Sequence, residues 1–224
     1  MRAPISVVIP TLDAEAGLPA TLTSLAEGLS AGLIRELVVS DGGSTDATRA
    51  IAEAAGAVWV SGAASRGGQL RRGARAAAGA WLLFLHADTV LRPGWARVVE
   101  DHLPRAEAAH FRLAFDRGGT PGRVVAGWAN LRSRALGLPY GDQGLLIRRA
   151  LYDAVGGHPD QPLMEDVVLA RALRGRLVAL DAVAETSAEK YRRDGWLRRG
   201  ARNLATLARH AAGADPEDLA RRYR

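Results

Sequence analysis

The sequence predicts an α/β protein in which helices cover both faces of a mostly parallel central sheet, followed by a helical extension towards the C-terminus. Strand-like and helix-like segments alternate through roughly the first ninety residues. The segment 81–85 is apolar at every position, which is typical of a strand buried on both faces. A chain of 224 residues that is 48% hydrophobic and 24% charged has the composition of one globular domain.

Short β-branched or apolar runs indicate the strands. The predicted strands cover residues 5–9, 37–39, 58–60, 81–85, 111–115, 145–147 and 177–180. Pro10 is expected to close the first strand, because proline cannot donate a hydrogen bond inside a central ladder.

Leucines at helical spacing predict a helix over residues 16–29, and Ser44 is expected to cap a helix that runs from about Thr45 to Gly56. Further helices are predicted over 70–78, 121–136, 163–173 and 195–212. Four β–α alternations imply right-handed crossovers and parallel pairing. We therefore expect one domain over residues 1–190 and a basic amphipathic extension over 191–224 that packs on it.

Composition excludes several classes of protein. The chain has no cysteine, so it has no disulfide, no thiol nucleophile and no thiolate metal site. Its apolar runs are shorter than the ~18 residues that cross a bilayer, and a strand-like segment follows the first four residues directly. We expect a cytoplasmic protein without a spanning helix or secretory signal.

The net charge is +6, and most of the basicity lies near the C-terminal end. Nine arginines occupy the last fifth of the chain: Arg192, Arg193, Arg198, Arg199, Arg202, Arg209, Arg221, Arg222 and Arg224. The predicted helix 195–212 has three open interpretations. It packs on the domain, closes over a ligand with Arg192 or Arg193 near phosphate groups, or lies peripherally on an anionic membrane.

Two motifs follow predicted strands, where open parallel sheets bind their ligands. Asp41-Gly42-Gly43 places a carboxylate and two glycines before a helix, which suits phosphate or nucleoside binding but also an ordinary turn. His86 and Asp88 point the same way after a buried strand, so they could ligate Mg²⁺ or Mn²⁺, or form a capping pair.

Two further polar segments lie in the second half. Glu165 and Asp166 lie at the start of the predicted helix 163–173. One of them could act as a general base, or both could simply be favourable negative charges at a helix start. The turn 141–144 is either a hairpin tip or an acceptor-binding loop. The glycine-rich phosphate loops of kinases and Rossmann dehydrogenases and the Gly-x-Ser-x-Gly elbow of hydrolases are all missing.

Taken in order, these segments resemble the family 2 glycosyltransferases of the GT-A fold. The resemblance spans residues 5 to about 181 and rests on Val7–Glu15, Val38–Thr48, Phe84–Thr89 and Met164–Asp166. A closer similarity, to bacterial enzymes assigned to arsenosugar biosynthesis, rests on Arg66–Leu70, Leu83–Thr89, Pro139–Gly144 and Pro162–Val167.

The resemblance implies an inverting, hexosyltransferase-like enzyme with a nucleotide-diphosphate sugar donor and a Mn²⁺ or Mg²⁺ cofactor. The implied nucleotide-sugar-binding residues are Pro10, Thr11, Glu15, Asp41, Gly43, Arg66, Gln69, Arg71, Gly73, Ala87 and Asp88. Asp166 is implied as the base with Glu165 beside it, Gly141, Asp142 and Gln143 as the acceptor-binding loop, and Asp88 with His86 as the metal ligands.

Two positions depart from the family pattern. His86 occupies the first position of the usual Asp-x-Asp, which bears on metal dependence. Arg71 replaces a common asparagine and could help to bind the diphosphate. Two other functions stay open: a sugar-nucleotide-synthesising nucleotidyltransferase, and a non-catalytic basic module that binds nucleic acid or membrane.

Overall fold

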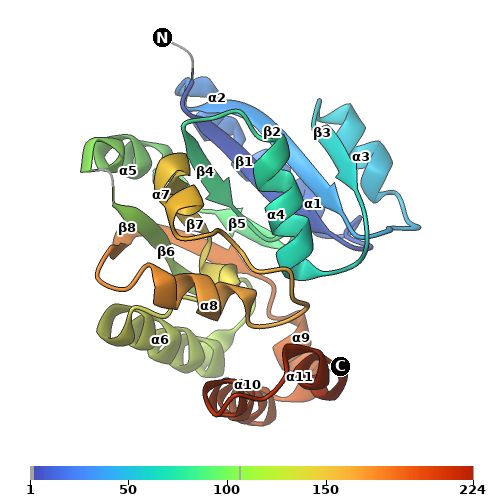
Figure 1. Cartoon of the computed structure of the whole chain (residues 1–224), viewed down its shortest axis with the longest axis vertical. Coiled ribbons are helices and arrows are strands. Elements are labelled where there is room, and N and C mark those ends of the chain that lie inside the picture. Colours follow the sequence, from blue (N-terminus) through green and yellow to red (C-terminus); the bar gives the residue numbers. More distant parts are fainter. Residues whose placement is uncertain (1–2, 106, 224) are drawn as a thin grey trace.

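A computed structural model describes residues 3–105 and 107–223 and confirms the predicted α/β fold (Figure 1). One eight-stranded sheet has the order β3-β2-β1-β4-β7-β6-β8-β5. The strands are β1 (Ile5–Thr11), β2 (Ile34–Asp41), β3 (Val58–Ser61), β4 (Trp81–Phe84), β5 (Thr89–Leu91), β6 (Ala108–Phe115), β7 (Leu145–Arg148) and β8 (Leu177–Thr186). The first four strands are parallel, as predicted, whereas β7 and β5 run antiparallel to their neighbours.

Helices cover both faces of this sheet (Figure 1). They are α1 (Leu18–Ser24), α2 (Ala26–Ser30), α3 (Thr48–Ala54), α4 (Arg66–Ala76), α5 (Trp95–His102), α6 (Gly119–Leu136), α7 (Arg149–Ala154), α8 (Glu165–Ala172), α9 (Glu189–Asp194), α10 (Trp196–Ala211) and α11 (Pro216–Tyr223). Two short 3₁₀ turns, η1 (Leu103–Arg105) and η2 (Gly141–Gln143), complete the described chain.

Alternation along the strands divides the core in two. Ile5, Val7 and Ile9 of β1 face a cluster that includes Leu18 of α1 and Trp95 of α5. Val8 faces the other side, with residues of α4, α7 and α8. This two-residue period is the expected property of a strand, so β1 is buried on both faces.

Helix starts differ from the prediction where side chains have other partners. Ser44 does not cap α3, because its hydroxyl donates to Oδ1 of Asp41 (2.5 Å). Instead Asp46 accepts the N–H of Thr48, where α3 begins. The predicted helix 70–78 starts earlier, at Arg66, because the Ser65 side chain accepts the Gly68 N–H (3.3 Å).

The C-terminal helices lie together at the lower end of the molecule in Figure 1. Trp196 at the start of α10 packs beside Gly122 of α6, where a side chain would come within 2.9 Å of the indole. Leu219 of α11 is buried against Leu163 and Val167. Among the described helices, none has both the length and the apolar character needed to cross a bilayer.

Candidate active site

The direction of the strands brings four segments to one edge of the sheet. β4 ends at Phe84, so His86 and Asp88 follow at its carboxyl end. Antiparallel β7 begins beside Phe84, which places the preceding turn, η2, at the same edge. β6 runs opposite to β7, and β8 runs parallel to β6, so both of these strands also end there.

These segments surround a cleft of about 150 Å³. It is lined by Arg66, His86, Asp88, Phe115, Tyr140, Gly141, Asp142, Leu163, Met164, Asp166, Thr186, Ser187, Lys190, Tyr191, Arg199, Asn203 and Tyr223. Residues far apart in the sequence, including Asp88, Asp142 and Asp166, therefore share one hollow. The turn 141–144 is not a hairpin tip, because it connects α6 to β7.

Asp166 is fixed at the start of α8. The Gly141 N–H donates to its Oδ2 (2.8 Å), and the Val167 N–H donates to its Oδ1 (2.7 Å). Met164, which precedes the helix, has a left-handed backbone (φ 65°), a conformation that side-chain-bearing residues rarely adopt. This turn directs the carboxylate of Asp166 into the cleft.

Asp142 lies in the same cleft with one oxygen unused. Among the described residues, its buried Oδ1 has no hydrogen-bond partner. Burial raises the pKa of Asp142 to about 6, Arg132 opposes that rise, and the charges of Asp166 and Asp88 add to it. Asp142 therefore has free hydrogen-bonding capacity for a bound hydroxyl.

Glu165 lies behind the cleft rather than in its wall. It is 1% exposed, and its Oε1 lies 3.7 Å from Nε of Arg66. Burial and the neighbouring charge of Asp166 raise the pKa of Glu165, and Arg66 offsets part of that rise. Arg66 itself is 41% exposed at its side chain and faces the cleft, so it can meet an anionic ligand there.

The start of α4 is held against the loop before α8. A side chain at Gly67 would come within 1.9 Å of the Pro159 carbonyl, and one at Gly68 within 2.4 Å of Oδ1 of Asp160. These glycines are therefore required for close packing. That packing sets Arg66 beside Glu165.

His86 is a neutral imidazole in this setting. Burial, assisted by the positive charge of Arg66, lowers the pKa of His86 to about 4, although Asp88 opposes the change. Within residues 3–105 and 107–223, no group of three or more His, Cys, Asp or Glu side chains is arranged to hold a metal ion. Asp88 and His86 nevertheless offer one oxygen and one nitrogen, which suits Mg²⁺ or Mn²⁺ completed by phosphate oxygens and water.

A second polar cluster lies at the ends of β1 and β2. Oδ1 of Asp41 accepts the hydroxyl of Thr11 (2.9 Å), and its Oδ2 accepts the N–H of Gly43 (2.7 Å). Burial would raise the pKa of Asp41, but hydrogen bonds from Ser44, Gly43 and Thr11 outweigh it and hold the pKa below its usual value. Asp41 is two strands away from β4, about 10 Å along the same edge.

Other residues predicted to bind ligands lie outside the cleft lining. These are Pro10, Thr11, Glu15, Asp41, Gly43, Gln69, Arg71, Gly73, Ala87, Gln143 and Glu165. Gln69 is buried and donates to the carbonyls of Thr11 (2.6 Å) and Ser40 (3.1 Å). Gly73 packs under β1, where a side chain would come within 2.4 Å of Val8.

Three of these residues have other neighbours. The Glu15 carboxylate accepts the N–H of Ala47 (2.9 Å). Gln143 is fully buried and accepts the hydroxyl of Ser133 (2.6 Å), so it braces η2. Arg71 is one of the charges acting on Tyr152, on the α7 side, whereas the adjacent Arg72 donates to the carbonyl of Asp41 (3.2 Å).

The sequence allowed the C-terminal helix to close over a ligand but did not identify the residues that form the C-terminal wall of the cleft. Arg192 and Arg193 are exposed, and it is Lys190 and Tyr191 of α9 that line the cleft. Tyr223 donates to Asn203 (2.7 Å), which in turn donates to Tyr191 (2.9 Å). The tyrosines of this network lie far apart in an arginine-rich segment, so no sequence motif indicated it.

Comparison with protein families identifies the family of the chain. The model of glycosyl transferase family 2 matches residues 6–133, which is more than half of the chain. The chain belongs to glycosyl transferase family 2. Family membership argues against the two open alternatives, a nucleotidyltransferase and a non-catalytic basic module. None of the curated proteins compared with the chain matches it significantly.

Solved structures share the fold of this family 2 chain. S. aureus TarS, in complex with UDP-GlcNAc, has a TM-score of 0.65 at 19% identity, over 82% of this chain and 58% of that one. Mycobacterium tuberculosis glucosyl-3-phosphoglycerate synthase, with Mn²⁺ and UDP-glucose, has a TM-score of 0.57 at 23% identity, over 82% and 69%. The chain spans 58% and 64% of the length of two TarS structures. At these identities and this coverage, the likeness establishes the fold alone.

Proposed function

We propose that this family 2 chain transfers a sugar from a nucleotide-diphosphate sugar to an acceptor hydroxyl, with inversion at the anomeric carbon. The observation that carries the proposal is the carboxylate of Asp166. It is oriented by the Gly141 N–H and lies in one cleft with Arg66, His86 and Asp88. A fixed carboxylate beside cationic and metal-ligating groups is what this reaction needs.

The donor would lie along the sheet edge from β2 to β4. Its nucleoside would occupy the β1–β2 end, near Pro10, Thr11, Glu15, Asp41 and Gly43. The diphosphate would then reach Arg66 and Asp88, about 10 Å away across two strand spacings. Gln69 and Gly73 support this edge from beneath.

Asp166 would accept the proton of the acceptor hydroxyl as that oxygen attacks the anomeric carbon. Asp88 and His86 would hold a divalent cation, which neutralises charge on the departing diphosphate when bound. Arg66 adds a fixed positive charge, and Glu165 holds that arginine in position. The UDP complexes of the structural neighbours, with Mn²⁺ in the synthase, support these roles.

The acceptor would enter from the side of η2 and the C-terminal helices. Gly141 orients the base, Asp142 has a free oxygen for a second hydroxyl, and Gln143 holds the turn. We further propose that residues 1–190 form the transferase domain and that 191–224 complete its acceptor side. The hexosyltransferase subtype and the arsenosugar subgroup belong to this proposal too, on the sequence similarity alone.

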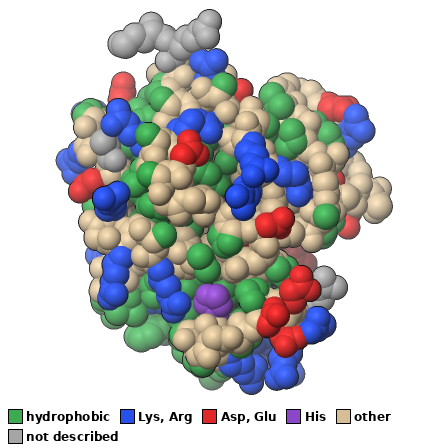
Figure 2. Space-filling model, viewed as in Figure 1, with side chains coloured by type: hydrophobic (Ala, Val, Ile, Leu, Met, Phe, Trp, Pro, Cys, Tyr) green, Lys and Arg blue, Asp and Glu red, His purple; other side chains and the backbone are tan. Residues whose placement is uncertain are grey.

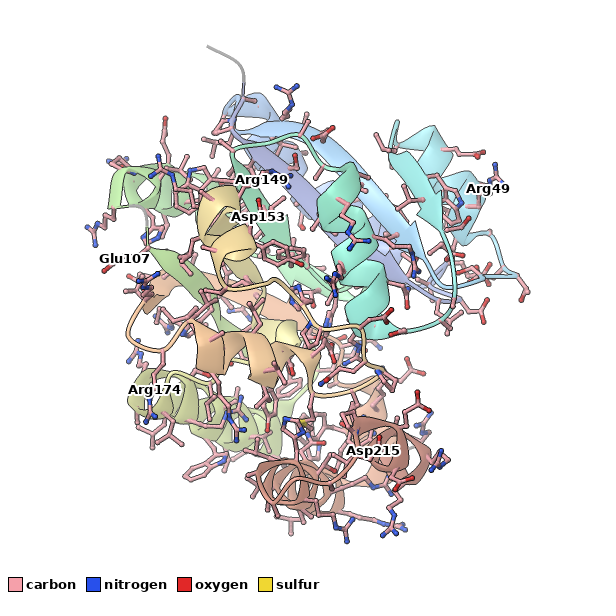
Figure 3. The ribbon with its side chains drawn as sticks, in the orientation of Figure 1. Arg49, Glu107, Arg149, Asp153, Arg174 and Asp215 are labelled. Carbon is pink, nitrogen blue, oxygen red and sulfur yellow. The ribbon has the colours of Figure 1, made fainter. Side chains whose placement is uncertain are left out.

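Asp166→Asn tests the proposal. Asparagine retains an oxygen for the Gly141 N–H but cannot take a proton, so turnover should fall by about 10²- to 10⁴-fold. Donor affinity should change less than about threefold, since no donor contact is lost. Asp153→Asn, an exposed carboxylate on α7 labelled in Figure 3, is the matched control.

The measurements are calorimetric titration of UDP-, GDP- and dTDP-sugars with Mn²⁺ and release of nucleoside diphosphate with a panel of acceptors. Near-normal turnover in Asp166→Asn would remove this residue from the mechanism. If no sugar nucleotide binds the unmodified chain, the transferase proposal itself fails.

A further inference from the structure

Two helices at the lower end of the molecule expose unusually many large apolar side chains. Of nine such side chains exposed in the described residues, six lie on α6 and α10. They are Val124, Trp128, Leu131 and Leu136 on α6, and Leu197 and Leu204 on α10. Figure 2 shows hydrophobic side chains along this end, with basic side chains among and below them. Neither the cleft nor the core accounts for them.

Three of the exposed side chains of α6 form one stripe. Val124, Trp128 and Leu131 are 66%, 54% and 57% exposed, and their spacing of four and three residues places them on one side of the helix. The opposite side carries the buried residues Ala126 and Ala129, which pack on β6. The stripe is therefore an outward face.

α10 repeats this arrangement. Leu197 is 91% exposed and Leu204 is 46% exposed, and the exposed alanines Ala201 and Ala208 continue the stripe at helical spacing. The opposite side of α10 holds buried Arg199. The two helices contact each other through Trp196, so both stripes belong to one end of the fold.

The charge on these helices has a single sign. α6 and α10 together carry seven arginines and no aspartate or glutamate. Arg123, Arg134, Arg198 and Arg209 are exposed. With α9 included, ten basic residues face two acidic ones, a net charge of +8 compared with +6 for the entire chain.

We propose that α6 and α10 dock on an anionic lipid bilayer. Leucine, valine and tryptophan would enter the boundary between headgroups and acyl chains, while the arginines bind lipid phosphates. The combination favours lipid over a second copy of the chain, because a twofold contact would place these arginines against one another. It also favours lipid over nucleic acid, because a nucleic acid would bind the arginines but would not bury the exposed leucines.

Docking would have a consequence for the cleft. α10 contributes Arg199 and Asn203 to the cleft wall from the side opposite its exposed stripe. The bilayer would therefore lie one helix away from the cleft. The proposal does not depend on the transferase reaction, because its test measures binding only.

The experiment is flotation of the full chain with vesicles. Phosphatidylcholine vesicles containing about one-third phosphatidylglycerol should bind at least about tenfold more protein than phosphatidylcholine alone, and salt near 0.5 M should reduce the binding. The double variants Trp128→Ser with Leu131→Ser, and Leu197→Ser with Leu204→Ser, should each lower binding at least about fivefold. Leu29→Ser, 61% exposed on α2, is the control and should bind normally.

All of these substitutions are at exposed positions, so the variants should fold, and circular dichroism would verify it. Sedimentation velocity without vesicles tests whether a second copy of the chain covers this surface instead of lipid. The proposal is overturned if anionic vesicles bind no protein at low salt, or if the two double variants bind as well as Leu29→Ser. A dimer that these same variants dissociate would also overturn it.

Discussion

Asp142 is a carboxylate whose charge costs the folded protein free energy. Its pKa is about 6 in the fold, compared with 3.8 for an ordinary aspartate, chiefly because of burial. The folded state therefore binds more protons than the unfolded state between about pH 4 and pH 6. The free energy of unfolding should fall as pH rises through that window and then level off.

We predict that Asp142→Asn stabilises the chain and weakens its function. At pH 7.5 the free energy of unfolding should rise by about 1 to 3 kcal/mol, because asparagine has no charge to bury. Near pH 4 the change should be small. Urea unfolding at both pH values measures it, with exposed Asp101→Asn as the control. An equal effect at both pH values would contradict the assigned cause.

If Asp142 also binds the acceptor, the same variant should raise the acceptor KM while the donor KM stays unchanged. When removing the charge of a residue stabilises the protein but lowers its activity, that residue is typical of a binding site.

At the level of single residues, the sequence located the motifs more reliably than it assigned a role to each residue in them. Asp88 and Asp166 were predicted and do share the cleft. Gln69 and Gly73 were predicted as ligand contacts; both are buried, and Gln69 donates to two backbone carbonyls. A motif residue that is needed for packing looks the same in one sequence as a residue that touches a ligand. Tyr223 was missed because only long-range folding brings it to the cleft.

At the level of elements, the contact between α4 and β1 depends on a missing side chain. A Cβ at Gly73 would come within 2.4 Å of Val8 and 3.4 Å of Ser40. A separation this short forces the helix away from the strand. Arg149 at the start of α7, labelled in Figure 3, holds the C-terminal end of α4 by donating to the carbonyls of Ala74, Ala77 and Gly79.

We predict that Gly73→Ala destabilises the fold by about 2 to 3 kcal/mol through overpacking. Gly127→Ala, on α6 with no atom near its Cβ position, should instead stabilise the helix by about 0.5 to 1 kcal/mol. Thermal unfolding of both variants checks the pair. Should Gly73→Ala unfold like the unmodified chain yet lose donor binding, Gly73 would be a ligand contact after all.

The predicted elements were correct where periodicity was strong. The parallel strands β1 to β4 were predicted in order, because each is a short apolar run between helix-like segments. The helix over 16–29 is two helices, α1 and α2, which meet at Leu25. β5, α5, α7, α9 and α11 were missed, because short segments carry too few periods to be read. Their positions depend on pairing partners far away in the chain.

At the level of the whole molecule, the C-terminal segment is part of the cleft and part of a core. Leu219 is 3% exposed and packs with Leu163, Met164 and Val167 at the start of α8. The same helix, α11, ends at Tyr223 in the cleft wall. One short helix thereby links the stability of this core to the proposed acceptor side of the cleft.

We predict that Leu219→Ala releases α11 without unfolding the sheet. The lost packing should cost about 2 to 4 kcal/mol locally, which is enough to detach a helix of two turns. Hydrogen exchange should accelerate over 216–223, and acceptor KM should rise more than donor KM. Leu197→Ala, at a position on α10 that is 91% exposed, is the control. Unchanged exchange in α11 would show that Leu219 does not anchor it.

Lys190 lines the cleft, and it is the only lysine in the sequence. Amine-directed reagents therefore have a single side chain to modify, at the mouth of the hollow and on an exposed position. A fluorophore attached there would report ligand entry without any engineered cysteine, and the absence of native cysteines leaves thiol chemistry free for a second, independently placed dye.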